Sequence, residues 1–485
     1  MNPRLLLAAT LLLPALAPAR TLGELEFSPC TLTAESGLPP VEAWCSQLEV
    51  PEDRSAPDGR RISLALAWIG PAAGASEPDP VFLLAGGPGQ SARDSYPSTA
   101  GAFSEILKQR NVILLDQRGT GGSNALQCES DEQDWDQLDP TPEYLADFTR
   151  QCLEKLSSHA DVRHYTTTDA VADLEAVRQA LGAETINLVG VSYGTRVAQQ
   201  YTGAHPERVR SVVLDGVVPN TLVLGQEHAA NLEESLAAQF QRCQQDPGCS
   251  TALGDPHQHL QTLKAELQAQ PRPVRYRDAT TGQVHEGRFS WPMLSALLRM
   301  YAYQPAVAST LPLLLHELAQ GQTDAAMAQA KMLLGSLGGS MAHGMGLSVS
   351  CSEDADELRV DPDDAGSVLG TEFIEYSQAQ CAVWPRGTRP DDFRQPLSTD
   401  TPVLLLSGEL DPVTPARYGE QVLEGLDHGV HLVLRGQGHN VIGAGCMPRL
   451  MAQFIESADA KSLETECLDR LSPTPPFSGY HGWEP

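Results

Sequence analysis

The chain has 485 residues, more than one average domain, so its length predicts a large core joined to an insertion or a second module. It carries 62 Asp and Glu residues against 33 Lys and Arg residues, a formal net charge of −29 at pH 7. Because contacts to phosphate groups need clustered Lys and Arg, this charge argues against nucleic acid or an anionic membrane surface as a partner.

The N-terminal segment has the pattern of an export signal. Arg4 precedes an apolar run from Leu5 to Ala17, and Ala17-Pro18-Ala19 has the small-x-small form of a signal-peptidase site. A membrane anchor is the alternative, but the run is short and Pro14 interrupts it, whereas a spanning helix needs roughly 20 apolar residues. We therefore predict that residues 1–19 are a signal peptide, that the protein is secreted or periplasmic, and that it does not span a membrane.

The ten cysteines are even in number, which fits disulfide bonding in an oxidising compartment. Their order along the chain suggests local pairs, although order alone does not establish connectivity: Cys30 with Cys45, Cys128 with Cys152, Cys243 with Cys249, Cys351 with Cys381, and Cys446 with Cys467. Metal binding is the competing interpretation. Because the chain has no CxxC pair and no Cys/His cluster, we predict no metal site.

From about residue 46 to residue 216, short β-branched runs alternate with helical stretches, which predicts repeated βαβ units and a mostly parallel sheet. Asp169 can cap a helix in this region, and Gly182 can end it. The clearest strands are 81–84, 112–115, 186–189 and 212–214.

After Pro219 strong strand signals become scarce and helical patterns dominate until about residue 395. Strand patterns return at 402–406 and 431–434. An interrupted and resumed sheet predicts an α/β core with a cap. The expected organisation is core residues 20–218, a mainly helical cap over 219–395, and further core residues 396–485.

The segment Gly190-Val191-Ser192-Tyr193-Gly194 lies between a predicted strand and a predicted helix, the context of a nucleophile elbow. A serine at the tip of so tight a turn adopts strained backbone angles, and side chains two residues away would crowd the strand and the helix. We therefore predict Ser192 to be a catalytic nucleophile.

A serine nucleophile needs a base, and in this arrangement an acid and then a histidine follow it along the chain. Asp411 lies on the loop beyond the strand at 403–406, and His439 lies on the glycine-rich loop beyond the strand at 432–434. We predict that His439 is the general base and that Asp411 orients it. Glu409 is the alternative acid on the same loop, and Asp215 at another strand end is a further rival.

Acyl transfer also needs hydrogen-bond donors for the developing oxyanion. Ala85-Gly86-Gly87-Pro88-Gly89 follows a strand, so we predict that the backbone amides of Gly87 and Tyr193 form this pair. A simple tight turn is the alternative. The segment from Asp116 to Gly121 lacks the lysine and spacing of a P-loop and is expected to be a structural loop near the site.

Together these motifs resemble the prolyl aminopeptidase and tripeptidyl aminopeptidase family of α/β-hydrolases, in its secreted branch. The matching segments span residues 86–439 and are specific as a set: 86–89, 116–119, 190–194, 408–415 and 438–439. Many relatives have a histidine before the two glycines, where this chain has Ala85, which leaves the subgroup open.

The resemblance implies an α/β-hydrolase core with a helical cap, and removal of one or a few residues from the free N-terminus of peptides. It also implies that cap carboxylates bind the substrate ammonium, and Glu353 and Asp354 lie in the matching acidic segment. A solvated acidic loop is the alternative for these two residues. The implied chemistry needs no metal and no organic cofactor.

Two other functions remain possible at this level. A carboxylesterase could use the same catalytic residues, with an apolar pocket lined by aromatic side chains of the cap. These aromatic residues are Trp291, Tyr301, Tyr303 and Trp384, which could equally form the core of the cap. A catalytically inactive binding scaffold is disfavoured because the motif set is complete.

Overall fold

The computed structural model describes residues 19–33, 37–71, 74, 76–128, 140–279 and 281–482, with the backbone alone for 334–340. The predicted signal peptide therefore lies, apart from Ala19, outside the described residues.

A ten-stranded sheet forms the core, in the spatial order β1-β2-β3-β4-β6-β5-β7-β8-β11-β12. The strands are β1 Arg20–Leu22, β2 Leu25–Leu32, β3 Val41–Pro51, β4 Arg61–Ile69, β5 Val81–Leu84, β6 Val112–Leu115, β7 Ile186–Val191, β8 Val209–Asp215, β11 Val403–Gly408 and β12 Gly429–Leu434. From β6 to β12 in this order all neighbours are parallel, which agrees with the predicted fold class.

The central strands are buried on both faces, which explains why they consist of uninterrupted apolar runs. Successive residues of β5 enter opposite layers: Phe82 and Leu84 pack in one hydrophobic cluster with α3 and α4, and Val81 and Leu83 pack in the other with α1 and α15. The helices of the core are α1 Ala92–Thr99, α2 Pro142–Leu156, α3 Thr167–Ala180, α4 Tyr193–Ala204, α14 Ala416–Leu423 and α15 Met447–Ser457.

The N-terminal edge of the sheet differs from the sequence prediction. β1, β2, β3, β4 and β6 pair antiparallel, whereas the predicted βαβ pattern begins near residue 46 and includes no strand before it. β2 alternates between buried and exposed residues because one of its faces meets solvent, and its pattern is correspondingly weaker than that of a buried strand.

The start of α3 also differs in detail. Thr166, rather than Asp169, is the N-cap, and the two residues form a reciprocal capping box at the first turn. Gly182 follows the helix with φ +67°, as the predicted end of the helix requires.

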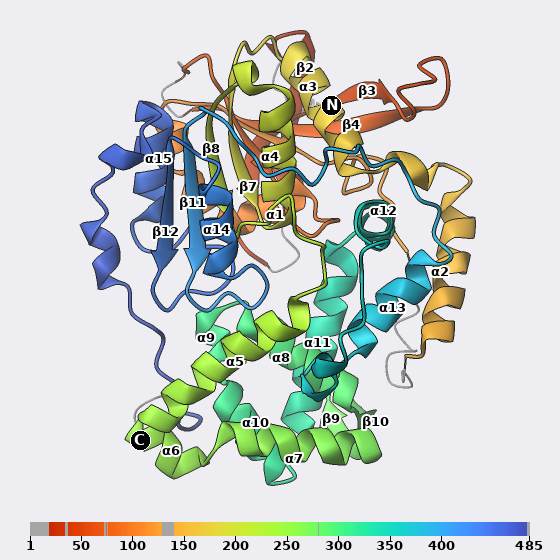
Figure 1. Ribbon diagram of the computed structural model, residues 1–485, viewed down its shortest axis with the longest axis vertical. Coiled ribbons are helices and arrows are strands. Elements are labelled where there is room, and N and C mark those ends of the chain that lie inside the picture. The colour runs from red at the N-terminus through yellow and green to blue at the C-terminus, as the bar shows by residue number, and fades with distance from the viewer. Residues whose placement is uncertain are drawn as a thin grey trace, which may run out of the picture.

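Between β8 and β11 the chain forms a mainly helical insertion with its own hydrophobic core. Its elements are α5 His228–Gln245, α6 Pro247–Leu253, α7 Pro256–Ala269, β9 Arg272–Arg277, β10 Val284–Phe289, α8 Trp291–Ala302, α9 Pro305–Ala308, α10 Leu311–Ala319, α11 Asp324–Ser340, α12 His343–Glu353 and α13 Glu372–Cys381. Figure 1 shows α5 to α11 beneath the sheet, on the side to which the arrowheads of β11 and β12 point, and α12 and α13 at the right, towards α2. The antiparallel hairpin of β9 and β10 is an element that the sequence did not reveal.

Five disulfides join the cysteine pairs that their order along the chain suggests, so this prediction is confirmed. Cys351–Cys381 links α12 to α13, which lies beside α2 in Figure 1. Such a set of disulfides indicates folding in an oxidising compartment. No helix within the described ranges has both the length and the apolar character needed to cross a membrane.

The C-terminal segment leaves the core after α15 and ends against the insertion, near α6 in Figure 1. The backbone amide of Phe477 donates a hydrogen bond of 2.9 Å to the carbonyl oxygen of Ser309, which lies between α9 and α10. Thr474 and Pro476 line one small pocket together with Leu410 and residues of α5 and α9. The tail therefore connects the two parts of the molecule.

Candidate active site

Ser192 lies at the turn between β7 and α4. Its backbone has φ 55° and ψ −123°, a positive-φ conformation that residues other than glycine rarely adopt. A Cβ at Gly190 would lie 2.5 Å from the carbonyl oxygen of Gly194, and one at Gly194 would lie 2.7 Å from that of Ala85. The strained serine and the two close approaches explain both glycines of the motif.

His439 and Asp411 form a buried hydrogen-bonded pair, with 2.7 Å between His439 Nδ1 and Asp411 Oδ2. Oδ1 of the same carboxylate accepts hydrogen bonds from the amides of Val413 and Thr414, and Oδ2 accepts one from the Thr414 hydroxyl. Burial raises the pKa of Asp411, but the charge and hydrogen bond of His439 outweigh it and hold this pKa below its ordinary value. Burial lowers the pKa of His439, but the charge of Asp411 raises it further, above the ordinary value. The pair is thus built to stabilise an imidazolium.

The two rival acids have other partners. Glu409 is 44% exposed and accepts hydrogen bonds from the amide of Gly436 and the guanidinium of Arg242. Asp215 is fully buried, and its carboxylate accepts hydrogen bonds from the amides of Val441 and Ile442. Burial raises the pKa of Asp215 to about 6. Of the three acids, Asp411 therefore meets the imidazole.

Asp215 brings the loops of Ser192 and His439 together. Its carbonyl oxygen accepts the amide hydrogen of Ser192 at 2.8 Å, while its carboxylate holds the residues that follow His439. The next residue, Gly216, has φ +68°, and a Cβ there would lie 2.9 Å from Cε1 of His439. The loops that carry Ser192 and His439 thus both contact the end of β8.

The glycine loop after β5 lies against the elbow. A Cβ at Gly86 would lie 3.0 Å from the Cβ of Ser192, and Gly87 has φ +108°. In the described part of the chain the amides of Gly87 and Tyr193 find no acceptor, Tyr193 because it is the first residue of α4. Both amides thus remain free as donors, which the predicted oxyanion role requires.

Glu353 and Asp354, which end α12, are both buried but have different partners. Asp354 forms ion pairs with Arg196 at 3.1 Å and Arg394 at 2.9 Å. Glu353 lies 3.8 Å from Arg196 and accepts hydrogen bonds from the amide and the hydroxyl of Thr167. Burial raises the pKa of Glu353 to about 7, against the opposing charge of Arg196.

A chain of hydrogen bonds joins Glu353 to the elbow. Its first link is the Thr167 hydroxyl, which lies 2.7 Å from the phenolic oxygen of Tyr193, and that oxygen accepts a hydrogen bond from the side-chain amide of Gln117 at 3.1 Å. The Thr167 hydroxyl has one proton, which it donates to the carboxylate, so Tyr193 must donate to Thr167. All the hydrogen bonds of this series are thus directed towards Glu353. Tyr193, the residue after Ser192, is therefore linked by hydrogen bonds to a buried acid of the insertion.

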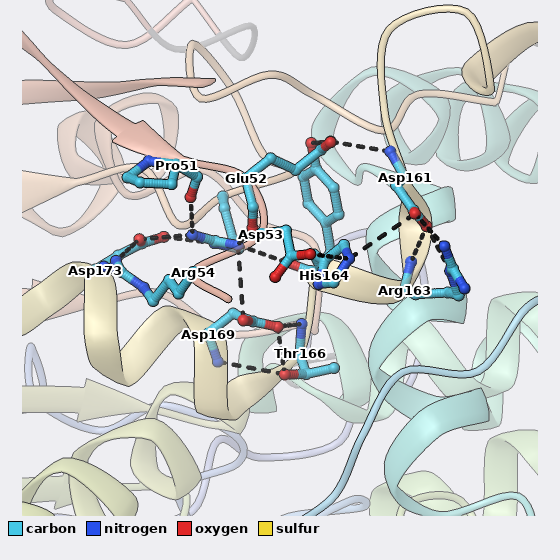
Figure 2. A network of polar contacts seen from close by, with 12 residues as sticks. Pro51, Glu52, Asp53, Arg54, Asp161, Arg163, His164, Thr166, Asp169 and Asp173 are labelled. Carbon is cyan, nitrogen blue, oxygen red and sulfur yellow. Dashed lines mark hydrogen bonds and ion pairs between the residues drawn. The ribbon is translucent and has the colours of Figure 1, made fainter. Parts of the chain in front are cut away.

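The neighbouring residue Arg118 anchors this arrangement. Its buried guanidinium donates to the carboxylate of Asp173 on α3 and to the carbonyl oxygens of Glu52 and His164. Figure 2 shows these three partners in one polar network, together with Asp169 and Thr166 at the start of α3. The segment from Asp116 to Gly121 is therefore a structural loop. Through Arg118 it fixes the start of α3, where Thr167 donates to Glu353.

Of the four aromatic residues considered for a pocket, Tyr303 contacts His439. Its carbonyl oxygen accepts the amide hydrogen of His439 at 2.8 Å, and the two rings meet edge to face with centroids 5.1 Å apart. Trp291 packs in the core of the insertion, Trp384 donates to Ser348, and Tyr301 donates to Gln329. Thr167 and Arg196 could not be predicted as residues of the site, because each meets an acid of the insertion through a contact distant along the chain. Tyr303 was expected only as a pocket residue, and its contact with His439 is new.

Within the described residues, no group of three or more His, Cys, Asp or Glu side chains is placed to share a metal ion.

A family model described as the alpha/beta hydrolase fold matches residues 79–443. The chain belongs to this family.

Two curated relatives of this α/β-hydrolase are similar over almost the whole chain, and a third is similar over a shorter part of it. Serine protease Hip1 of Mycobacterium tuberculosis is 25% identical over 468 residues, which cover 89% of this chain and 88% of the relative. Tripeptidyl aminopeptidase of Streptomyces coelicolor is 27% identical over 502 residues, covering 95% and 89%. Proline iminopeptidase of Neisseria gonorrhoeae is 30% identical over 138 residues, covering 28% and 32%.

Proposed function

We propose that this α/β-hydrolase is a serine aminopeptidase that removes one or a few residues from the free N-terminus of peptides. The observation that carries the proposal is the buried carboxylate of Glu353, joined through Thr167 to the residue after the nucleophile. A substrate ammonium entering a site of low dielectric needs a carboxylate nearby, because an unpaired buried charge is costly.

In this mechanism His439 takes the proton of Ser192 as its oxygen attacks the scissile carbonyl carbon. The amides of Gly87 and Tyr193 stabilise the oxyanion of the tetrahedral intermediate. The imidazolium, held by Asp411, then gives its proton to the leaving nitrogen, and an acyl-enzyme forms. Water attacks the acyl carbon with His439 again as base, and the N-terminal fragment is released.

Of the two acids assigned to the ammonium, we favour Glu353. Asp354 already has two guanidinium partners, so its charge is compensated within the protein. Glu353 is held by one threonine and lies 3.8 Å from a guanidinium that Asp354 shares. Asp354 then acts by holding Arg196 beside Glu353.

The names of two relatives, tripeptidyl aminopeptidase and proline iminopeptidase, support a peptidase acting at N-termini. A carboxylesterase on the same catalytic residues is the alternative. The aromatic pocket expected for it is not favoured, because Trp291 and Trp384 are packed in the interior.

The test is steady-state cleavage of matched chromogenic amides with free or acetylated N-termini, and of a simple acyl ester. The enzyme is compared with Ser192→Ala and Glu353→Gln. We expect cleavage of free N-termini alone, its loss in Ser192→Ala, and a fall of about 30-fold or more in kcat/KM for Glu353→Gln, since a buried charge loses its partner. Equal cleavage of acetylated substrates, or turnover of the ester alone, would reject the aminopeptidase.

We further propose that residues 1–19 direct export and are removed, which places the enzyme in the periplasm or the medium. The confirmed disulfides support an oxidising compartment. N-terminal sequencing of the exported protein should begin at Arg20, and retention of residues 1–19 would contradict the proposal.

A further inference from the structure

Arg299, in the last turn of α8, has no carboxylate partner within the described chain, although the protein holds 62 acidic residues against 33 Lys and Arg. The other half-buried arginines of the insertion form ion pairs: Arg242 with Glu409, Arg272 with Glu266, Arg389 with Asp356, and Arg394 with Glu357. The arginines of the insertion for which the described chain shows no ion pair besides Arg299 are all exposed: Arg275, Arg277, Arg288, Arg359 and Arg386. A half-buried guanidinium without an anion is less stable than a paired one, so its position calls for a partner from outside the chain.

The surroundings of Arg299 hold its side chain without neutralising it. The guanidinium lies 4.8 Å from the ring centroid of Phe373 and interacts with the hydroxyl of Tyr303. His228 stacks near the same ring, with centroids 5.5 Å apart. Burial, reinforced by the charge of Arg299, lowers the pKa of His228 to about 3, so this imidazole is neutral at pH 7 and adds no second positive charge.

Tyr303 places this group on the histidine side of the site. Its ring meets the imidazole of His439 edge to face, and its carbonyl oxygen accepts the His439 amide hydrogen. Arg299 lies one helical turn before Tyr303. Glu353, in contrast, reaches the site through Tyr193, on the oxyanion side of Ser192.

In amide cleavage, different parts of the substrate bind on these two sides of Ser192. His439 must donate its proton to the leaving nitrogen, so the residues after the scissile bond begin beside the imidazole. The residues before it, which carry the free ammonium, extend towards Glu353. A cation on the histidine side therefore faces the leaving fragment.

We propose that Arg299 forms a subsite for a carboxylate on the leaving fragment, either its C-terminal carboxylate or an acidic side chain. This inference rests on the proposed aminopeptidase function and extends it: the site would bind short peptides at both ends, with an acid for the ammonium and an arginine for the carboxylate. A planar guanidinium suits a carboxylate because it can donate two parallel hydrogen bonds.

Three leaving fragments of equal length test the subsite in matched peptides with one acyl part. The first ends in a free carboxylate, the second in an amide, and the third in an amide with Glu as its first residue. We expect kcat/KM to be roughly tenfold higher for the first or third peptide than for the second, as a charge-assisted hydrogen bond would give. Preference for the first assigns the C-terminus and preference for the third assigns the side chain.

Arg299→Gln should abolish this preference and leave cleavage of an uncharged chromogenic amide nearly unchanged, which also shows that the variant folds. Arg275→Gln, on the exposed face of β9, removes the same charge elsewhere on the insertion and should keep the preference. Equal rates for all three peptides, or a preference that survives in Arg299→Gln, would overturn the subsite.

Binding separates this inference from the proposed function. The affinity of the same peptides for Ser192→Ala, measured by calorimetry, should show the carboxylate preference, and the Ser192→Ala/Arg299→Gln protein should lack it. If the enzyme cleaves no free N-terminus, the aminopeptidase proposal fails, whereas this affinity difference still decides whether Arg299 binds a carboxylate. Equal affinities would reject the subsite whatever the enzyme cleaves.

Discussion

Asp411 and Glu409 lie on one loop, yet they differ in what they contact. Asp411 is buried against His439, whereas Glu409 is 44% exposed and pairs with Arg242. We therefore expect Asp411→Asn to lower kcat by about 10³- to 10⁴-fold, because an amide at this place no longer holds the imidazole in its reactive tautomer.

The matched control is Glu409→Gln, which should change kcat about twofold or less. Steady-state kinetics on one chromogenic amide measures both variants, and thermal unfolding shows whether each is folded. A large loss in Glu409→Gln beside a mild one in Asp411→Asn would reverse the assignment of the two acids.

Glu353 should make the folded protein sensitive to pH. Its pKa of about 7 lies above the ordinary 4.5, chiefly through burial, so the folded chain keeps a proton that the unfolded chain loses. Its contribution to stability is thus fully present below about pH 4.5 and is lost as the pH rises to about 7. Glu353→Gln cannot lose this proton. Between pH 4.5 and pH 7 the free energy of unfolding of the wild type should therefore fall by on the order of 2–3 kcal/mol more than that of the variant.

Urea unfolding at the two ends of that window measures the difference. Glu234→Gln, whose side chain is 69% exposed on α5, is the control and should follow the wild-type profile. Parallel profiles for Glu353→Gln and the wild type would show that the carboxyl is not held in its protonated form by burial.

At the scale of elements, the elbow joins β7 to α4 with almost no free space. A Cβ at Gly194 would press on the carbonyl oxygens of Leu84 and Ala85, whereas one at Gly203, in the same helix, would meet its nearest atom on Leu397 at 3.9 Å. Gly194→Ala should destabilise the protein by about 3 kcal/mol or more, since the backbone of the next strand cannot yield.

Gly203→Ala should be neutral or stabilise the protein by about 0.5–1 kcal/mol, because alanine favours the helix. The midpoints of urea unfolding for the two variants measure this contrast. Equal destabilisation of both would mean that α4, and not its approach to the glycine loop, limits stability.

The elements themselves were partly predictable from the sequence. The buried parallel strands were, and so were the places of Ser192, Asp411 and His439 on loops that follow a strand, because each loop carries local glycine or proline signals. The catalytic roles of these three residues stay a prediction. The antiparallel strands β1 to β3 were not, since exposure on one face weakens their apolar pattern. The contact between Thr167 and Glu353 spans 186 residues, and no local pattern encodes such a distance.

The same limit explains the acids. Nothing near Asp215 or Asp354 in the sequence tells that one holds the histidine loop and the other two arginines. From residue type and order alone, each could have a catalytic or a binding role. The residues that each contacts in the folded protein distinguish between these roles.

At the scale of the whole molecule, the sheet and the insertion meet around the catalytic loops, and the C-terminal tail crosses between them. A Cβ at Gly436, beside the histidine loop, would touch Pro473, and Phe477 donates to Ser309 in the insertion. The tail thus binds the part that carries His439 to the part that carries Tyr303.

Truncation after Ser472 removes this connection and retains the disulfide between Cys446 and Cys467. We expect the insertion to open more often, because local unfolding is controlled by the contacts that join an element to the rest. Limited proteolysis should cut the insertion several-fold faster than in the full chain, and KM should rise more than kcat falls, since Tyr303 and Glu353 both belong to the insertion. Replacement of His481, which is exposed in the tail, by Ser is the control and should leave both readouts unchanged. Unaltered proteolysis of the truncated protein would mean that the sheet and the insertion hold together without the tail, through contacts such as the one between His439 and Tyr303.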